Sequence, residues 1–215
     1  SSFNCQSAEI TNTTIEELNT DIRNCTLLEI PYTQPKPSLS KCYRYNTGAC
    51  CNSVHDFEIN SQLENLLTRS CLIKYPALID LFCMGCSPFQ PFFTHPDTKT
   101  IKICKSFVDT LWIPEEVDAT GNETIKETTL STPTTLFDNC GFKTTDYLKQ
   151  YTDKSYVIPS NIFNNATDFL WKMEIPFFAG YKFEILDEAE LSQAELDIVD
   201  RLCFKETEMI KLSIG

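Results

Sequence analysis

The 215-residue chain is long enough for one domain with a sizeable core, and its 42% hydrophobic and 12% aromatic content excludes disorder throughout. Acidic residues outnumber basic ones 30 to 18, so the formal net charge is −12. This sign excludes a protein that neutralises nucleic-acid phosphates and disfavours a polybasic membrane patch.

The first third of the chain predicts two helices separated by a loop. A helix over 13–25 is indicated by an apolar face and by Thr13 and Glu16, which have capping-box spacing. Residues 31–41 are interrupted by prolines and predict a loop. A second helix is predicted over 56–71, where the apolar side chains recur at helical spacing: Ile59, Leu63, Leu66 and Leu67.

The middle of the chain alternates between apolar and polar segments. A short helix is predicted after Pro76, then a proline-containing loop over 87–99, then a helix over 101–112. Residues 114–136 are rich in Thr and Glu and predict a long exposed loop. This acidic, Thr-rich loop is either a partner-binding element or a solvated insertion.

The C-terminal part predicts one strand and one helix. Tyr181, Phe183 and Ile185 alternate with charged residues, which is typical of a strand. Ser192 and Glu195 have the spacing of a capping box and predict the start of a C-terminal helix over 192–212. No internal repeat is visible, so residues 1–215 are expected to form one domain.

The cysteines and glycosylation sequons indicate an oxidising compartment. The chain has 11 cysteines, and their spacing provides no zinc-ligand set, so disulfide bonds are expected. Four sequons predict N-glycosylation at Asn12, Asn24, Asn122 and Asn165. We therefore expect a glycoprotein that is secreted or displayed on the cell surface.

The chain ends are consistent with this location. The sequence begins at Ser1 without a charged and apolar leader, which we interpret as a mature form after signal-peptide removal. No apolar run of about 18 residues is present, so no membrane span is predicted. The only membrane link considered is a lipid anchor on the small residues at 213–215.

The sequence lacks the signatures of catalysis. The two histidines, His55 and His95, are interpreted as surface or loop residues, since no nucleophile motif accompanies them. Cys83 and Cys86 have the spacing of a redox motif, but their place in a dense cysteine cluster favours structural disulfides to two different partners. We expect a non-enzyme with no cofactor and no metal.

The most informative region is the cysteine-rich core block, residues 42–112. It contains CYRYNTGACC from Cys42, with seven residues before the adjacent pair Cys50 and Cys51, and later DLFCMGCSP and IKICKSFVDTLW. This block resembles the folate-receptor-like superfamily, which includes folate receptors, riboflavin-binding proteins and, more distantly, the sterol-binding N-terminal domain of the Niemann–Pick type C transporter. The resemblance covers about a third of the chain and implies a disulfide-rich α+β fold, mostly helices with short strands and long loops.

The resemblance also implies a set of disulfide bonds. The implied pairs are Cys25 with Cys50, Cys42 with Cys83, Cys51 with Cys86, Cys104 with Cys140, and Cys71 with Cys203. This set leaves Cys5 without an implied partner. Cys5 is either a free thiol, a member of a locally rearranged disulfide bond, or the site of an intermolecular disulfide.

A ligand site is implied at two residues. Asp56 resembles the aspartate that grips the ligand in folate receptors, and Trp112 lies where those receptors have a tryptophan. The stacking aromatic residues of the receptors are absent after Asp56, so we do not expect folate to bind. The other interpretation of Asp56 is a helix N-cap.

We expect a non-catalytic extracellular binding module, whose target is either a small apolar or aromatic molecule or a protein partner. The alternative is a structural subunit of an extracellular or cell-surface assembly, in which self-association replaces the ancestral pocket. A binding module should keep a pocket under the core block. A structural subunit should instead fill that space with side chains such as Phe89, Phe92 and Phe93.

Overall fold

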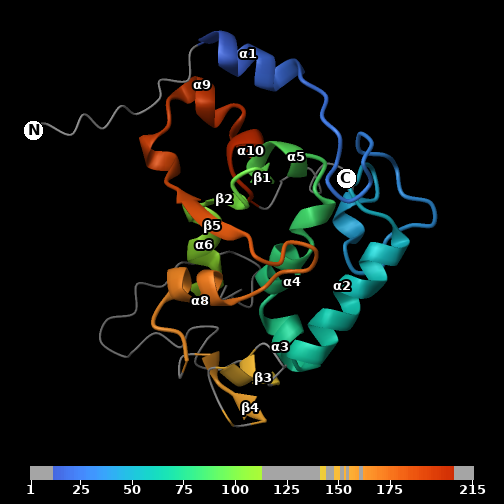
Figure 1. Ribbon diagram of the computed structural model, residues 1–215, viewed down its shortest axis with the longest axis vertical. Coiled ribbons are helices and arrows are strands. Elements are labelled where there is room, and N and C mark those ends of the chain that lie inside the picture. Colours follow the sequence, from blue (N-terminus) through green and yellow to red (C-terminus); the bar gives the residue numbers. More distant parts are fainter. Residues whose placement is uncertain are drawn as a thin grey trace, which may run out of the picture.

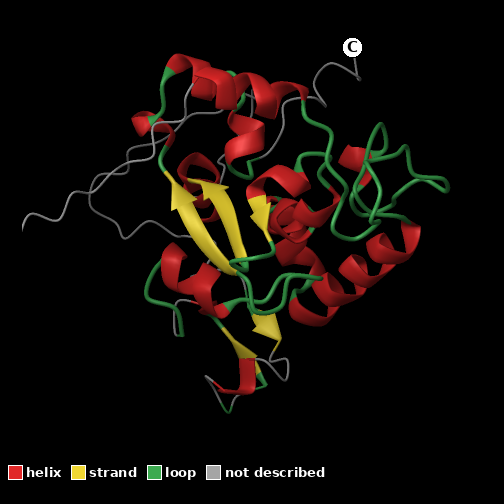
Figure 2. Ribbon diagram, turned by 45° about the horizontal axis from the view of Figure 1, so that its top comes forward, coloured by secondary structure: helices red, strands yellow, loops and turns green. Residues whose placement is uncertain are grey.

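A computed structural model describes residues 12–112, 141–143, 148–150, 153, 155–159 and 162–205 of the chain, as Figure 1 shows. These residues form a mixed α+β structure in which short helices surround a small sheet (Figure 2). The first half of the chain contains α1 (Asn12–Thr20), η1 (Tyr43–Tyr45), α2 (Ser53–Leu66), α3 (Arg69–Lys74), α4 (Ala77–Phe82), η2 (Met84–Cys86) and α5 (Gln90–Phe93). The predicted helix over 13–25 therefore ends at Thr20, five residues early.

The second half continues with β1 (Thr94–His95), β2 (Thr100–Cys104), α6 (Lys105–Trp112), β3 (Phe142–Lys143), η3 (Leu148–Gln150) and β4 (Tyr156–Val157). It ends with α8 (Ala166–Lys172), β5 (Lys182–Leu186), η5 (Glu188–Glu190), α9 (Gln193–Leu196) and α10 (Val199–Leu202). The loop expected over 114–136 lies outside the described residues.

Helix α2 begins earlier than predicted because its N-cap is Asn52. The Asn52 side chain accepts hydrogen bonds from the backbone N–H groups of Val54 and His55, and His55 Nδ1 accepts from the Asn52 N–H. The buried face of the helix is made by residues at helical spacing: Ile59, Leu63 and Leu66.

The predicted helix over 56–71 is interrupted after Leu66. Leu67 is extended and forms an isolated β-bridge with Phe142, and Thr68 then caps the separate helix α3 by accepting from the Cys71 N–H. A β-branched cap residue next to an extended residue ends one helix and starts another. The short helix predicted after Pro76 is confirmed as α4.

A three-stranded sheet of order β1-β2-β5 lies at the centre of the structure. β2 pairs with β5 in parallel, from Thr100 opposite Lys182 to Cys104 opposite Leu186. The strand predicted around Phe183 is confirmed as β5. The prediction of a single helix over 101–112 is wrong in its first part, because Thr100–Cys104 is a strand and only Lys105–Trp112 is a helix.

The prediction of loop over 87–99 is also wrong in part. Gln90–Phe93 forms the short helix α5 with Pro91 in its first turn, where the missing N–H of proline does no harm. α5 leads directly into β1, and Phe93 is almost fully buried.

Most of the buried side chains belong to one core. It lies between the sheet and the helices on either side of it, and its fully buried members include Ile59, Leu63, Leu78, Leu81, Ile101, Ile103 and Leu111. A second, small cluster forms around Cys104, Val199 and Cys203. Between them, the ring of Phe204 lies 4.9 Å from that of Phe107 and 5.6 Å from that of Phe93, measured between centroids.

The C-terminal segment folds as two short helices where one continuous helix was predicted. The capping box at Ser192 and Glu195 is confirmed, but it starts the four-residue helix α9, and α10 follows as a separate four-residue helix. Figure 1 shows both helices in red and orange over the α5 and β1 end of the sheet. Residues 206–212 of the predicted helix lie outside the described residues.

Candidate functional site

Three disulfide bonds organise the N-terminal part of the core block. Cys25 is bonded to Cys50, Cys42 to Cys83, and Cys51 to Cys86, as the resemblance implies. Cys83 and Cys86, the pair with redox-motif spacing, are therefore bonded to two different partners. The cysteines are almost completely buried, as expected of structural disulfides.

The two remaining implied pairs are wrong. Cys104 is bonded to Cys203, not to Cys140, and the Cα atoms are 5.1 Å apart. This pairing follows from the sheet, since β2 places Cys104 beside Phe204: the Cys104 N–H donates to the Phe204 carbonyl. Cys71 is disulfide-bonded as well, but to none of these eight cysteines. Cys5 and Cys140 lie outside the described residues.

Asp56 anchors a loop. It lies in the first turn of α2, with Asn52 as the N-cap, so its interpretation as the cap residue is wrong. Its carboxylate is only 5% exposed and accepts hydrogen bonds from the backbone N–H groups of Ser40, Lys41 and Cys42 at 2.7 to 3.1 Å. These bonds fix the loop that leads into η1, and they occupy the oxygens that a ligand would need.

Trp112, the other candidate ligand residue, is the last residue of α6. Its side chain lies outside the described part of the structure. The structure therefore provides no contact between Trp112 and Asp56.

The two histidines lie in different elements, His55 in α2 and His95 in β1. His55 serves the α2 capping box, its ring lies 5.1 Å from that of Phe177, and burial lowers its pKa. His95 lies in β1, and its pKa is lowered by burial and by the positive charges of Lys102 and Arg23. Both rings are therefore held in the neutral form by their surroundings.

A small hollow lies between η1 and α4, and we call it the Tyr43 groove. Residues 41–45 line one side, and Pro76, Ile79, Asp80 and Cys83 line the other. The Cys42–Cys83 disulfide joins the two sides. The hollow holds about 50 Å³, room for a few water molecules or the end of one side chain.

The Tyr43 groove combines an exposed ring with a partly buried ion pair. Tyr43 is 61% exposed at the rim. Arg44 Nη1 lies 3.1 Å from Asp80 Oδ1, and the Asp80 side chain is only 8% exposed. The Arg44 side chain is 24% exposed, so the ion pair is partly buried, and an exposed tyrosine beside an oriented arginine is a composition typical of protein-binding hot spots. The one signal for it in the sequence is the charged Asp80 within the apolar run of α4.

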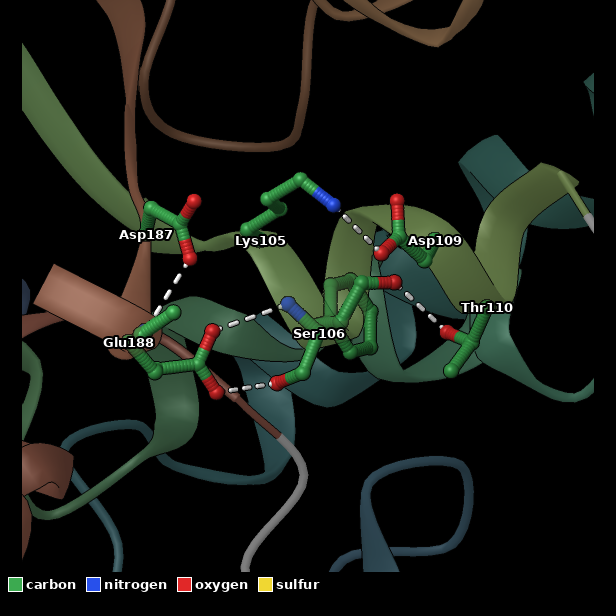
Figure 3. A network of polar contacts seen from close by, with 8 residues as sticks. Lys105, Ser106, Asp109, Thr110, Asp187 and Glu188 are labelled. Atoms are coloured by element: carbon green, nitrogen blue, oxygen red, sulfur yellow. Dashed lines mark hydrogen bonds and ion pairs between the residues drawn. The ribbon is translucent and has the colours of Figure 1, made fainter.

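A polar network joins α6 to the C-terminal segment (Figure 3). Glu188 accepts from both the backbone N–H and the hydroxyl of Ser106, the first of these at 2.9 Å. Lys105 and Asp109, one helical turn apart, form an exposed ion pair beside it. Because the same carboxylate binds a free N–H at the start of α6, Glu188 acts as a helix cap supplied by a distant segment.

Two of the predicted glycosylation sites can be placed on the surface. Asn24 is exposed. Asn165 is exposed as well and caps α8, with its Oδ1 accepting from the Asp168 N–H at 2.8 Å, which leaves its Nδ2, the glycan-bearing atom, unused by the cap. Asn12 begins α1, and Asn122 lies outside the described residues.

Within the described ranges, no cluster of three or more metal-ligating side chains is present. No helix in this part of the chain combines the length and apolar character needed to cross a membrane. No protein-family model matches the chain, and no curated protein is significantly similar to it.

Proposed function

We propose that the protein is a non-catalytic extracellular binding module, diverged from the folate-receptor-like group, and that its target is a protein surface bound at the Tyr43 groove. Three of the disulfides expected from the family and the exposed sequon at Asn24 support this origin and location. The use of the His55 ring in the α2 capping box and the absence of nucleophile motifs in the sequence favour a non-enzyme.

We favour a protein target over a small ligand such as a pterin or flavin because of the hydrogen bonds that Asp56 makes. The carboxylate that would grip a small ligand is saturated by the backbone of residues 40–42. Of the three phenylalanines expected to fill the space of a lost pocket in a structural subunit, Phe92 and Phe93 are buried and Phe89 is half-buried, which disfavours a small-molecule carrier and also fits the structural alternative. A pterin or flavin needs a concave site that encloses most of its surface, and the Tyr43 groove is too small for one.

Exposed apolar side chains on α2 support protein binding. Phe57 and Val54 in the first turns of α2 are 71% and 62% exposed. The hydrogen bonds of Asp56 join these turns to the loop that leads into Tyr43. Val54 and Phe57 are three residues apart on the helix, so they lie on one face and form a small exposed apolar surface, a feature of interaction sites.

The test is native mass spectrometry of the non-reduced protein from its source, compared for wild type and Tyr43→Ala. We expect a complex with a second polypeptide that is weakened at least tenfold by Tyr43→Ala, as for a hot-spot residue. Trp171→Ala is the matched control, since Trp171 is 68% exposed on α8 and should leave the complex intact.

Two outcomes would contradict the proposal. A monomer that carries a small dissociable mass would show that the protein is a small-molecule carrier. A complex that is equally stable with Tyr43→Ala and Trp171→Ala would show that the partner binds elsewhere. A complex composed only of copies of this chain would identify the partner as the protein itself, in a structural assembly.

A further inference from the structure

Two of the four arginines in the chain stack on one phenylalanine ring. The arginines are Arg23, Arg44, Arg69 and Arg201. The guanidinium carbon of Arg23 lies 4.7 Å from the Phe92 ring centroid, and that of Arg201 lies 5.7 Å from the same centroid and 4.9 Å from that of Phe89. The two arginines come from opposite ends of the sequence, and α5 brings them together.

Arg201 lacks the partner that a half-buried arginine normally has. No ion pair of Arg201 is present among the described residues, and its Nε is buried without a hydrogen-bond acceptor. The neighbouring Asp200 leaves its Oδ1 equally unpaired, and burial raises the pKa of this carboxyl group. Unpaired buried polar atoms are rare in folded proteins, so an arginine retained in this state requires an explanation.

Arg23 is also available for binding. Its Nε–H donates to Asp21 at 2.8 Å, but both side chains of this pair are about two-fifths exposed, at 39% and 44%. Such a surface pair is weak, and a guanidinium carries five N–H donors. Donors of Arg23 beyond Nε therefore remain free for a ligand, in the part of the structure described.

One further basic residue, Lys102, lies near Arg23, within a chain whose net charge is −12. Lys102 and Arg23 are both close enough to His95 to lower its pKa, after the larger effect of burial, while Glu184 acts in the opposite direction. Asp21, Glu184 and Asp200 are the acids around this surface, and Asp21 already binds Arg23. We call Arg23, Phe92 and Arg201 the arginine–phenylalanine cluster.

We propose that the arginine–phenylalanine cluster binds a carboxylate of an acidic partner protein. A guanidinium held over an aromatic ring is restrained in position, and its fork of N–H donors matches a carboxylate in a bidentate arrangement. A polyanionic glycan is disfavoured as the partner, because Asp21, Glu184 and Asp200 lie around the two arginines and would repel a long row of negative charges, whereas a single carboxylate can approach between them. This surface is separate from the Tyr43 groove, so the proposal does not rest on the proposed function.

The experiment follows the Nε–H signals of the four arginines by NMR during titration with succinate, a dicarboxylate probe. All forms carry Asn24→Gln, since a glycan on the exposed Asn24 would adjoin Arg23. We expect saturable shifts of the Arg23 and Arg201 signals, and no saturable shift of the Arg69 signal, which is an exposed arginine on α3. Succinamide, the neutral analogue, should shift none of them.

Variants separate the carboxylate site from a purely structural role of the stacking. Arg201→Lys keeps the charge but loses the planar fork, so succinate should bind about tenfold more weakly, the effect of losing one hydrogen bond to a charged group. Arg69→Lys should bind succinate as the parent does. Equal shifts of Arg69 and Arg201, or no saturable shift, would overturn the proposal. A stronger response to a heparin-derived oligosaccharide than to a glutamate-rich peptide would overturn it in favour of a sulfated glycan.

Discussion

The disulfide block, residues 25–86, and the C-terminal segment, residues 182–204, are held in place by different means. The disulfide block contains η1, three helices and long loops, and three disulfides cross it, with sequence separations of 25, 41 and 35. The C-terminal segment lies along β2 through a five-residue parallel ladder and has one disulfide, with a separation of 99.

This difference shows what replaces a hydrogen-bond ladder when the chain is mostly loop. Buried side chains fix the loops of the disulfide block: Asp56 accepts from the backbone N–H groups of residues 40–42, and Gln90, from α5 outside the block, accepts from the Thr26 N–H and donates to the Thr26 hydroxyl. In the C-terminal segment the ladder satisfies the backbone, and only Glu188 is needed to join it to α6. Crosslinks and buried polar anchors thus stabilise the loops of the first region, and strand pairing stabilises the second.

Removal of the long-range disulfide should produce the largest effect. We expect Cys104→Ala with Cys203→Ala to lower the free energy of unfolding by about 4 kcal/mol, because a loop of 99 residues gains much entropy when it opens. The control, Cys42→Ala with Cys83→Ala, opens a loop with a separation of 41 and should cost less, because the Cys51–Cys86 disulfide keeps the same region crosslinked. Chemical denaturation measures both values, and a larger loss in the control would contradict the comparison.

Loss of the Asp56 carboxylate should rank next. Asp56→Ala leaves three backbone N–H groups of the loop without acceptors and should destabilise the protein by about 3 kcal/mol. Asp56→Asn, which keeps one oxygen, should cost less. Denaturation together with hydrogen exchange at residues 40–42 measures the effect. Unchanged exchange at these amides in Asp56→Ala would show that the carboxylate does not hold the loop.

The sequence predicted elements well where one periodicity covers the whole element. Ile59, Leu63 and Leu66 repeat at helical spacing and lie on the buried face of α2, and Phe183 marks β5. Residues 101–112 mixed two periods, since Ile101 and Ile103 alternate on a strand while Phe107, Val108 and Leu111 repeat on a helix. A single helical or strand period fitted to the whole segment cannot show that the strand ends at Cys104 and the helix begins at Lys105.

The candidate site was less predictable because its partners are backbone groups and distant segments. The sequence indicates Asp56 as a candidate ligand residue, but the groups that bind it are backbone N–H groups of residues 40–42, which every residue except proline has and which no sequence pattern identifies. The pairing of Cys104 with Cys203 depends on Phe204 lying beside β2, which only the tertiary structure shows. Arg23 and Arg201 both contact Phe92 because Phe92 lies in α5, a helix that the prolines of residues 87–99 made look like a loop.

Glu188 provides a smaller test of the C-terminal segment. Glu188→Ala removes the cap of α6 and should lower the free energy of unfolding by about 1 kcal/mol. Lys105→Ala is the control in the same network, since the exposed Lys105–Asp109 pair should contribute nothing measurable. Thermal unfolding of the two variants compares them, and equal melting temperatures would show that Glu188 does not cap α6.

The smallest expected effect is a pH dependence from Asp200, next to the Cys104–Cys203 disulfide. Burial raises the pKa of Asp200 above its usual 3.8, so the folded state binds a proton more tightly than the unfolded state does. Stability contributed by this group is therefore lost as the pH rises from 3.8 through the raised pKa. Asp200→Asn removes the buried charge and should raise the melting temperature at pH 7 by about 1 to 2 °C. The difference should disappear below pH 3.8, where Asp200 is protonated in both states; a constant difference at all pH values would place its cause in packing instead of charge.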